Sequence, residues 1–281
     1  MSTPGAAEAA LVGAMWSWAS SVLEPALLLR DRVRDRDGER QPESGGLGPL
    51  FSARHDAPVL LDRPTEHDHL VVEFDRMAEA YEAFVRPFSS PVFTAAVREL
   101  GPLLPRDARV LDAGCGPGRE LRAMARLIPR GEVVGVDLAA GMVRSAHRAA
   151  RAAGLDNTAF VQADVGDLPG AFDAAFDLVY NCLAHHHYPE PVAAARSVNR
   201  VLRPGGWYAV IDPGPEWFVA LSAPLARLAD PGWVSFHTPA QFGELFSAAG
   251  FSEFRWVDLL PGFGIALGRK SRNDHENPAE P

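Results

Sequence analysis

V-L-D-A-G-C-G-P-G-R, residues 110–119, is the stretch of this chain that decides its fold. A short apolar run ends in Asp112, glycines follow at positions 114, 116 and 118, and a helical pattern begins at Arg119. A strand, a glycine turn and a helix in that order allow a ligand to approach backbone N–H groups at a helix N-terminus. The stretch therefore predicts a site for a nucleotide-like ligand.

Strand and helix patterns alternate outward from this stretch. Apolar runs predict strands at 109–113, 133–137, 159–162, 176–181 and 207–212, and helical patterns occur at 119–128, 141–153 and 191–202. A further helix at 239–249 precedes a closing pair of strands at 254–259 and 264–268. Gly205-Gly206 after Arg203-Pro204 is expected to close a helix and restart a strand. Strands separated by helices indicate βαβ units around a buried parallel sheet.

The flanking segments are expected to lie outside this core. Residues 9–29 are apolar but contain Glu24 and Pro25, so we expect an amphipathic arm rather than a membrane span. The arm would pack on the core or on a second subunit, as in a homodimer. Residues 31–66 are rich in Arg, Asp, Gly and Pro and predict a linker or mobile loop, which completes an N-terminal extension at 1–69. A core domain follows at 70–270, opening with a helical pattern that Pro87 and Pro91 break, and 271–281 is expected to be a disordered tail.

Composition narrows the class of protein. The chain has 281 residues, is 47% hydrophobic and carries a formal net charge of -9. A general nucleic-acid binder usually has a basic face, so we expect no nucleic-acid partner. Two cysteines, Cys115 and Cys182, are too few for a disulfide framework or a cysteine metal site and are expected to be packing residues. No signal peptide is evident, and a cytoplasmic enzyme is the expectation.

The glycine turn departs from the dinucleotide fingerprint G-x-G-x-x-G. Gly114 and Gly116 fit it, but the third glycine position holds Arg119. Asp112, directly before the glycines, would repel a pyrophosphate and suits a ligand with a cationic amine. A nicotinamide dehydrogenase is therefore the least favoured of the nucleotide-binding enzymes.

The ordered motifs resemble those of the class I S-adenosylmethionine-dependent methyltransferases, over roughly residues 70–269. The resemblance is carried by V-L-D-A-G-C-G-P-G, V-V-G-V-D-L-A-A-G-M, V-Q-A-D-V-G-D-L-P, F-D-L-V-Y-N-C-L-A-H-H-H-Y-P-E-P and L-R-P-G-G-W-Y-A-V-I-D-P. It implies a Rossmann-like α/β fold: a mostly parallel seven-stranded sheet, with its last strand antiparallel and inserted between the fifth and sixth and helices on both faces. It also implies S-adenosylmethionine as the cofactor.

The same resemblance implies a set of cofactor-binding residues. Asp112 would order the ammonium group of the cofactor and Asp137 would accept its ribose hydroxyls. Asp164 would accept the adenine amino group, with the Val165 N–H donating to the ring; a helix cap at Asp137 and an ordinary loop acid at Asp164 are the structural alternatives. The remaining members are Tyr81 over the methionine carboxylate, Ala113, Gly114, Gly116 and Gly118 in the turn, Leu138 directly after Asp137, Met142 beside the adenine, and the backbone carbonyl of Asn181. Met142 and Tyr81 fit plain packing equally well.

The acceptor side is encoded less clearly. His186 and His187 follow the fourth strand and are candidates for a general base or an acceptor-orienting group, against a role in packing the wall of the site. No metal is expected, because adjacent residues on a turn point in different directions. Asp212, Trp217 and His237 are the candidate acceptor contacts, the last two in an aromatic insertion at 213–237.

Methyl transfer to a flat or apolar small molecule, by in-line displacement, is the function that these residues favour. Oxygen, nitrogen and carbon acceptors stay open. Two alternatives keep the fold: non-methylating chemistry such as cyclisation or decarboxylation on the same ligand, and a partner subunit without catalysis. Nucleic-acid methylation is disfavoured, because the fourth segment reads Asn181-Cys182-Leu183 and lacks N-P-P-Y.

Overall fold

The computed structural model describes residues 57–60, 89–230 and 232–272. Their strands form one seven-stranded sheet with the order β3-β2-β1-β4-β5-β7-β6. The strands are β1 Arg109–Ala113, β2 Glu132–Asp137, β3 Thr158–Gln162, β4 Phe176–Cys182, β5 Leu202–Pro213, β6 Phe251–Leu260 and β7 Phe263–Lys270. β7 is antiparallel to both of its neighbours, β5 and β6. The predicted insertion of an antiparallel last strand between the fifth and sixth is therefore confirmed.

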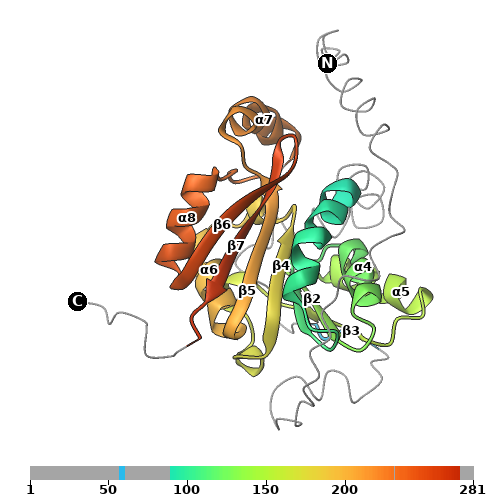
Figure 1. Ribbon diagram of the computed structural model, residues 1–281. Coiled ribbons are helices and arrows are strands. Elements are labelled where there is room, and N and C mark those ends of the chain that lie inside the picture. The colour runs from blue at the N-terminus through green and yellow to red at the C-terminus, as the bar shows by residue number, and fades with distance from the viewer. Residues whose placement is uncertain (1–56, 61–88, 231, 273–281) are drawn as a thin grey trace, which may run out of the picture.

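Helices cover both faces of the sheet (Figure 1). Their bounds are α4 Arg119–Leu127, α5 Ala140–Ala152, α6 Pro191–Val201, α7 Glu216–Ala229 and α8 Pro239–Ala248. Short 3₁₀ turns occur at η1 Gly101–Leu103, η2 Val165–Asp167, η3 Gly170–Phe172 and η4 His185–His187. α4 and α5 lie on one face and α6 and α8 on the other, while α7 lies beyond one end of the sheet. The architecture is the three-layer α/β sandwich that βαβ units produce.

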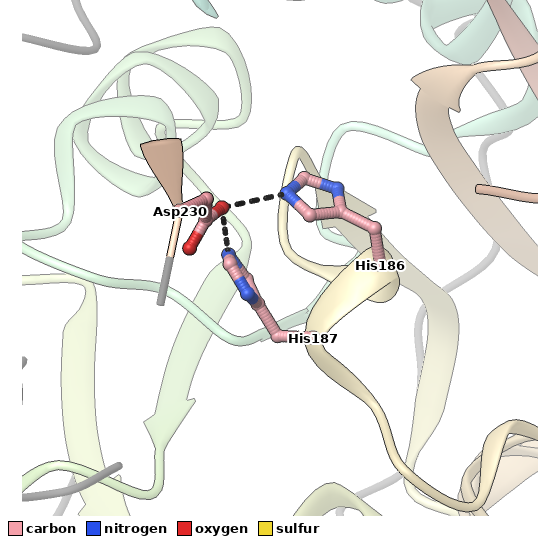
Figure 2. A group of neighbouring side chains, drawn as sticks. All are labelled: His186, His187 and Asp230. Atoms are coloured by element: carbon pink, nitrogen blue, oxygen red, sulfur yellow. Dashed lines mark ion pairs between the residues drawn. The ribbon is translucent and has the colours of Figure 1, made fainter. Parts of the chain in front are cut away.

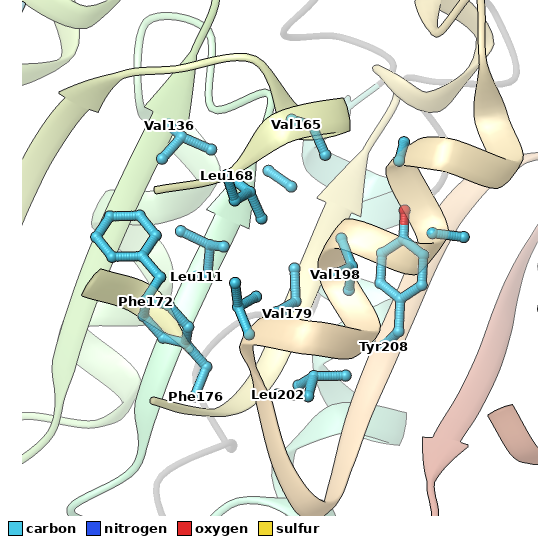
Figure 3. Close-up of a cluster of buried hydrophobic side chains, with 14 of the residues drawn as sticks. Leu111, Val136, Val165, Leu168, Phe172, Phe176, Val179, Val198, Leu202 and Tyr208 are labelled. Carbon is cyan, nitrogen blue, oxygen red and sulfur yellow. The ribbon is translucent and has the colours of Figure 1, made fainter. Parts of the chain in front are cut away.

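Alternate residues of the central strands supply the two halves of the core. In β1, Leu111 belongs to the cluster under α6 and α8, whereas Val110 belongs to the cluster under α4 and α5. Figure 3 shows the first cluster, in which Leu111, Val136 and Val179 from neighbouring strands meet Val198 of α6. Because both faces are buried, the strands read as continuous apolar runs rather than as alternating ones.

Two details of the fold differ from the sequence-based expectation. Residues 203–206 were expected to end a helix, but α6 already ends at Val201 and β5 begins at Leu202. Phe176 pairs with Leu202 and Leu178 with Trp207, so the extra residues between them bulge out of β5, with Gly205 at a φ of 78°. The segment 213–237, predicted as an aromatic insertion, contains the fourteen-residue helix α7, which the sequence patterns did not predict.

Several expectations fall wholly or partly outside the described residues. The arm at 9–29, most of the segment 31–66, the start of the helical pattern at 70–100 and Tyr81 are among them. Within the predicted linker, Val59 forms a parallel bridge to Val161 next to β3. Residues 89–100 are helical, with Pro91 near the start of this run. In the part of the chain that is described, no helix combines the length and the apolar character needed to cross a membrane.

Candidate functional site

The glycine turn after β1 adopts backbone angles that side chains disfavour. Gly114, Gly116 and Gly118 have φ values of 82°, 49° and 75°. The N–H groups of Gly114 and Cys115 both donate to the carbonyl of Val136, which ties the turn to the end of β2. A Cβ on Gly116 would meet no described atom within 4 Å, whereas one on Gly118 would lie 2.8 Å from the Cβ of Ala146 in α5. Gly116 therefore leaves room for a ligand, and Gly118 lets α4 and α5 approach closely.

A cavity opens in front of this turn, at the carboxyl ends of the parallel strands. It holds about 1100 Å³ of space free of atoms, its open mouth included. Nine of the predicted site residues line it: Asp112, Gly114, Gly116, Asp137, Leu138, Met142, Asp164, Val165 and His187. Residues from four βα connections therefore meet around one cavity.

Asp112 is a buried carboxylate at the wall of the cavity. Asp112 is 2% exposed, and its Oδ2 accepts a hydrogen bond of 2.7 Å from the hydroxyl of Tyr180. Loss of hydration raises the pKa of Asp112 well above its ordinary value; the Tyr180 hydroxyl lowers it, and the charges of Glu120 and Asp137 raise it further. A cationic group bound in the cavity would oppose this shift by favouring the ionised carboxylate.

Two further acids of the cavity, Asp137 and Asp164, are oriented by backbone N–H groups. Asp137 accepts from Gly116 N at 2.8 Å through Oδ2 and from Ala139 N at 2.9 Å through Oδ1. Asp164 Oδ1 accepts from Gly166 N at 2.7 Å and caps η2. Each carboxylate oxygen has two lone pairs, so capping and ligand binding are compatible at both residues.

These residues fit S-adenosylmethionine, the cofactor that the family resemblance implies. The buried, proton-retaining Asp112 gains from a cationic amine, the open space at Gly116 admits close approach to the backbone, and Asp137 presents acceptors to hydroxyl groups. Met142 adds an apolar surface that suits a flat ring.

Three predicted cofactor residues lie behind the cavity wall. Gly118 packs against α5, as described above. The carbonyl of Ala113 accepts hydrogen bonds from the Asn181 side chain and from the Tyr188 hydroxyl. Asn181 is fully buried and its Oδ1 also accepts from Ala184 N, so its side chain joins the end of β1 to the turn after β4. Tyr81 lies outside the described residues.

The histidine turn η4 carries the residues that were predicted for the acceptor side. His186 Nδ1 lies 2.7 Å from Asp212 Oδ1, and both residues are buried. Burial lowers the pKa of His186, but the charge and hydrogen bond of Asp212, with the charge of Asp230, raise it above its ordinary value. Burial and the neighbouring His186 lower the pKa of His187. Of the two, His187 lines the cavity, and His186 stands behind it.

Asp230 completes a group that the sequence did not suggest. Its Oδ2 lies 3.7 Å from His186 Nε2 and 3.6 Å from His187 Nε2 (Figure 2). Within the residues that the structure describes, these three side chains form a cluster that could hold a metal ion. The expectation that adjacent histidines on this turn point in different directions is wrong, because both Nε2 atoms reach the same carboxylate oxygen.

The predicted acceptor contacts are spread over the region around the histidines. Asp212 is fully buried and contacts His186 rather than the cavity. His237 packs against His185, with ring centroids 5.3 Å apart. Trp217 lies on α7 and is 60% exposed. The structure thus brings Asp212 and His237 to the histidine turn, while Trp217 faces solvent.

Sequence reasoning missed Glu120, Tyr180 and Tyr188 as well as Asp230. Glu120 lies in the first turn of α4 and lines the cavity. Its position just after the glycine turn is the only signal in the sequence that could have indicated this. Tyr188 lines it too and follows the histidines directly in the sequence. Tyr180 becomes apparent only once β1 and β4 pair and Asp112 stands opposite it.

Comparison with known proteins agrees with this geometry. Residues 110–206 match a protein family described as Methyltransferase domain. The chain is 39% identical over 127 residues to a fatty-acid O-methyltransferase of Mycolicibacterium smegmatis, covering 43% of this chain and 45% of that protein. It is 33% identical over 205 residues to nocamycin O-methyltransferase of Saccharothrix syringae, covering 65% and 72%. The YcgJ structure from Bacillus subtilis shares the fold, with a TM-score of 0.57 at 21% identity over 65% of this chain and 99% of that one. The chain thus matches less than half of the first relative's length.

Proposed function

Because the chain belongs to the class I S-adenosylmethionine-dependent methyltransferase family, we propose that it transfers a methyl group to an oxygen atom of a small, largely apolar acceptor. The observation that carries the proposal is the single cavity shared by Asp112, Gly116, Asp137 and Asp164 at the carboxyl edge of the sheet. That edge is where ligands of open α/β sheets bind.

Different residues of the cavity would bind different parts of the cofactor. Asp112 would hold the ammonium group, Asp137 the ribose hydroxyls and Asp164 the adenine amino group, with Met142 against the ring. When bound, S-adenosylmethionine supplies a methyl group already activated by a sulfonium charge. The protein is therefore left to position the acceptor and to exclude water.

An oxygen acceptor is supported by the names of the relatives. The two relatives described above, at 39% and 33% identity, are named as O-methyltransferases, one of a fatty acid and one of nocamycin. Leu183, Ala184 and Pro189 give the cavity an apolar wall next to the histidine turn. Such a wall favours an acceptor whose body is apolar and whose reacting oxygen is its main polar group.

The histidines are the groups of this chain that act on the acceptor oxygen. His187 reaches the cavity and would orient a hydroxyl or carboxyl group there. His186 and its partner Asp212 support it from behind and complete a site that can take up a proton. Asp212 is thus a positioning residue in this proposal.

Calorimetry of the purified chain with S-adenosylmethionine, its demethylated product and NAD tests the proposal. We expect micromolar binding of the first two and none of NAD. Asp137→Ala should weaken binding about tenfold or more, because it removes the ribose acceptors. Asp156→Ala, which removes an exposed carboxylate in the loop before β3, is the matched control and should bind like the unmodified chain.

Binding of NAD alone, or of neither sulfonium ligand, would overturn the proposal. Where binding holds, the mass of the product identifies the reaction, with a fatty acid and a phenol as probe acceptors. A gain of one methyl supports transfer. An isomer of the acceptor would instead support the cyclisation alternative.

A further inference from the structure

His186, His187 and Asp230 are arranged like the protein ligands of a catalytic metal centre. The two distances from Asp230 Oδ2 to the imidazole Nε2 atoms, 3.7 Å and 3.6 Å, exceed the 2.7–3.2 Å of an N–H···O hydrogen bond. Donor atoms that share a tetrahedral metal at about 2.1 Å lie roughly 3.4 Å apart. The carboxylate oxygen therefore lies nearer to the spacing of a shared cation than to that of a hydrogen bond.

Two of the three side chains, His186 and Asp230, are held in place by a second contact, as metal ligands usually are. His186 Nδ1 is paired with the buried carboxylate of Asp212 at 2.7 Å. Asp230 Oδ1 accepts from Gly232 N at 3.0 Å, which leaves Oδ2 for the imidazoles. The contacts are those of a carboxylate–histidine–metal arrangement.

The segment that carries Asp230 is fastened to the histidine turn itself. Val234 N and Ser235 N donate to the backbone carbonyl of His186, at 2.8 Å and 3.3 Å. Phe236 packs edge-on against the His186 ring, with centroids 5.2 Å apart. Asp230 is therefore fixed beside the histidines by main-chain bonds and an apolar cover rather than by its own charge alone.

We infer that His186, His187 and Asp230 bind a divalent transition-metal cation of borderline softness, for which Zn²⁺ is the representative. Two imidazole nitrogens and one carboxylate oxygen suit such a cation and are a poor match for Mg²⁺, which prefers oxygen ligands. Three protein ligands leave a coordination position open. Because His187 also lines the cavity, that position is available to the oxygen of an acceptor.

The catalytic use of the cation rests on the proposed function, but its binding does not. A cation held by both Nε2 atoms occupies the lone pairs that a general base would use. The cation, rather than an imidazole, then lowers the pKa of the acceptor hydroxyl, and the released proton goes to solvent. His186 and His187 become ligands in this arrangement, and Asp212 orients His186.

Calorimetric titration of the tag-free full chain with ZnCl₂, after dialysis against a chelator, tests the inference. We expect one equivalent per chain with micromolar or tighter affinity. Asp230→Asn keeps the shape of the side chain but removes the charge, and should weaken binding at least tenfold. Asp212→Asn should weaken it about ten- to hundredfold, as loss of a partner behind a metal ligand does. Glu190→Gln, an exposed carboxylate near the same turn, should bind zinc like the unmodified chain.

Co²⁺ gives a second readout that does not depend on activity. Its visible d–d absorption should appear on binding and be abolished by Zn²⁺ but not by Mg²⁺. Absence of saturable Zn²⁺ binding, or equal binding by the Asp230→Asn variant with its folding confirmed by circular dichroism, would overturn the inference. A parallel titration with the demethylated cofactor separates the two proposals: its binding without Zn²⁺ binding rejects only the metal site, and the reverse rejects only the proposed function.

Discussion

Asp112 is a buried acid whose environment disfavours its ionised form in the free protein and suits a cationic ligand. It lies against the cavity with Tyr180 as its hydrogen-bond donor and with two further acids, Glu120 and Asp137, raising its pKa. The folded state therefore holds a proton on Asp112 more tightly than the unfolded chain does. Since the folded pKa is raised, this group makes the free protein less stable as pH rises from the ordinary aspartate pKa through the raised one.

Cofactor binding should consequently depend on pH through Asp112. An ammonium group beside the carboxylate favours its ionised form, so binding at a pH below the raised pKa must release a proton. Affinity is expected to increase with pH up to that pKa, by no more than about tenfold per pH unit for one proton. Calorimetry with the demethylated cofactor in two buffers of different ionisation enthalpy measures the proton release directly.

The Asp112→Asn variant is the matched test of this linkage. Its amide oxygen can still accept the Tyr180 hydrogen bond, but it has no proton to release. We expect weaker binding, without the pH dependence that Asp112 confers and without buffer dependence of the binding enthalpy. Unchanged proton release in this variant would assign the linkage to another group of the cavity.

Gly118, at the end of the glycine turn, packs directly against Ala146 of α5. Gly118 precedes α4 with a φ of 75°, and an added Cβ would lie 2.8 Å from Ala146 Cβ and 3.2 Å from its Cα. Gly154, after α5, has a similar φ of 66°, but a Cβ there would meet no described atom within 4 Å. The two glycines share a backbone conformation and differ in their surroundings.

Alanine at these two positions should therefore separate strain from packing. Both variants bear the cost of a left-handed residue with a side chain, about 1–2 kcal/mol. Gly118→Ala should lose a further 1–3 kcal/mol or so of unfolding free energy, because α4 and α5 must move apart. Urea unfolding measures both losses. Equal losses of unfolding free energy in the two variants would mean that α4 and α5 move apart without measurable cost.

The elements that the sequence predicted share one property. β1 ends just before Gly114, β2 ends at Asp137 and α4 begins just after Gly118, and each buries apolar residues on the side that its pattern predicts, so local pattern and tertiary position agree. α7 was missed because the pattern rules look for a buried face, and this helix exposes its leucines and contains Pro224. The bulge at 203–206 was missed because only pairing with β4 reveals it.

The residues of the site likewise fall into two groups: those that a local motif predicts and those that only the folded chain brings together. Asp112, Gly116 and Asp137 stand at strand ends, so their motifs placed them on the cavity without knowledge of the packing. Asp230 reaches His187 only through the main-chain bonds of residues 234 and 235 to His186. No local pattern encodes a contact of that kind, and a lone aspartate after a helix carries no signal of it.

At the scale of the whole molecule, α7 departs from the rule that each helix buries an apolar face against the sheet. None of its described residues is buried, and Trp217, Leu221, Leu225 and Leu228 are all at least 47% exposed. α6, by contrast, buries Ala194, Ala195, Ser197, Val198 and Val201. Low burial leaves the hydrogen bonds of a helix open to local unfolding.

In the free protein, the backbone amides of α7 should therefore exchange hydrogen much faster than those of α6. Because α7 leads directly into Asp230 and the segment bonded to the His186 carbonyl, order in the site should propagate to it. Adding the demethylated cofactor with a fatty acid as probe acceptor is expected to slow exchange in α7 and to leave α6 unchanged. Mass spectrometry of peptides from both helices measures the contrast. Exchange in free α7 as slow as in α6 would show that its exposed apolar side is already covered in solution, and would remove the helix from the acceptor-dependent part of the molecule.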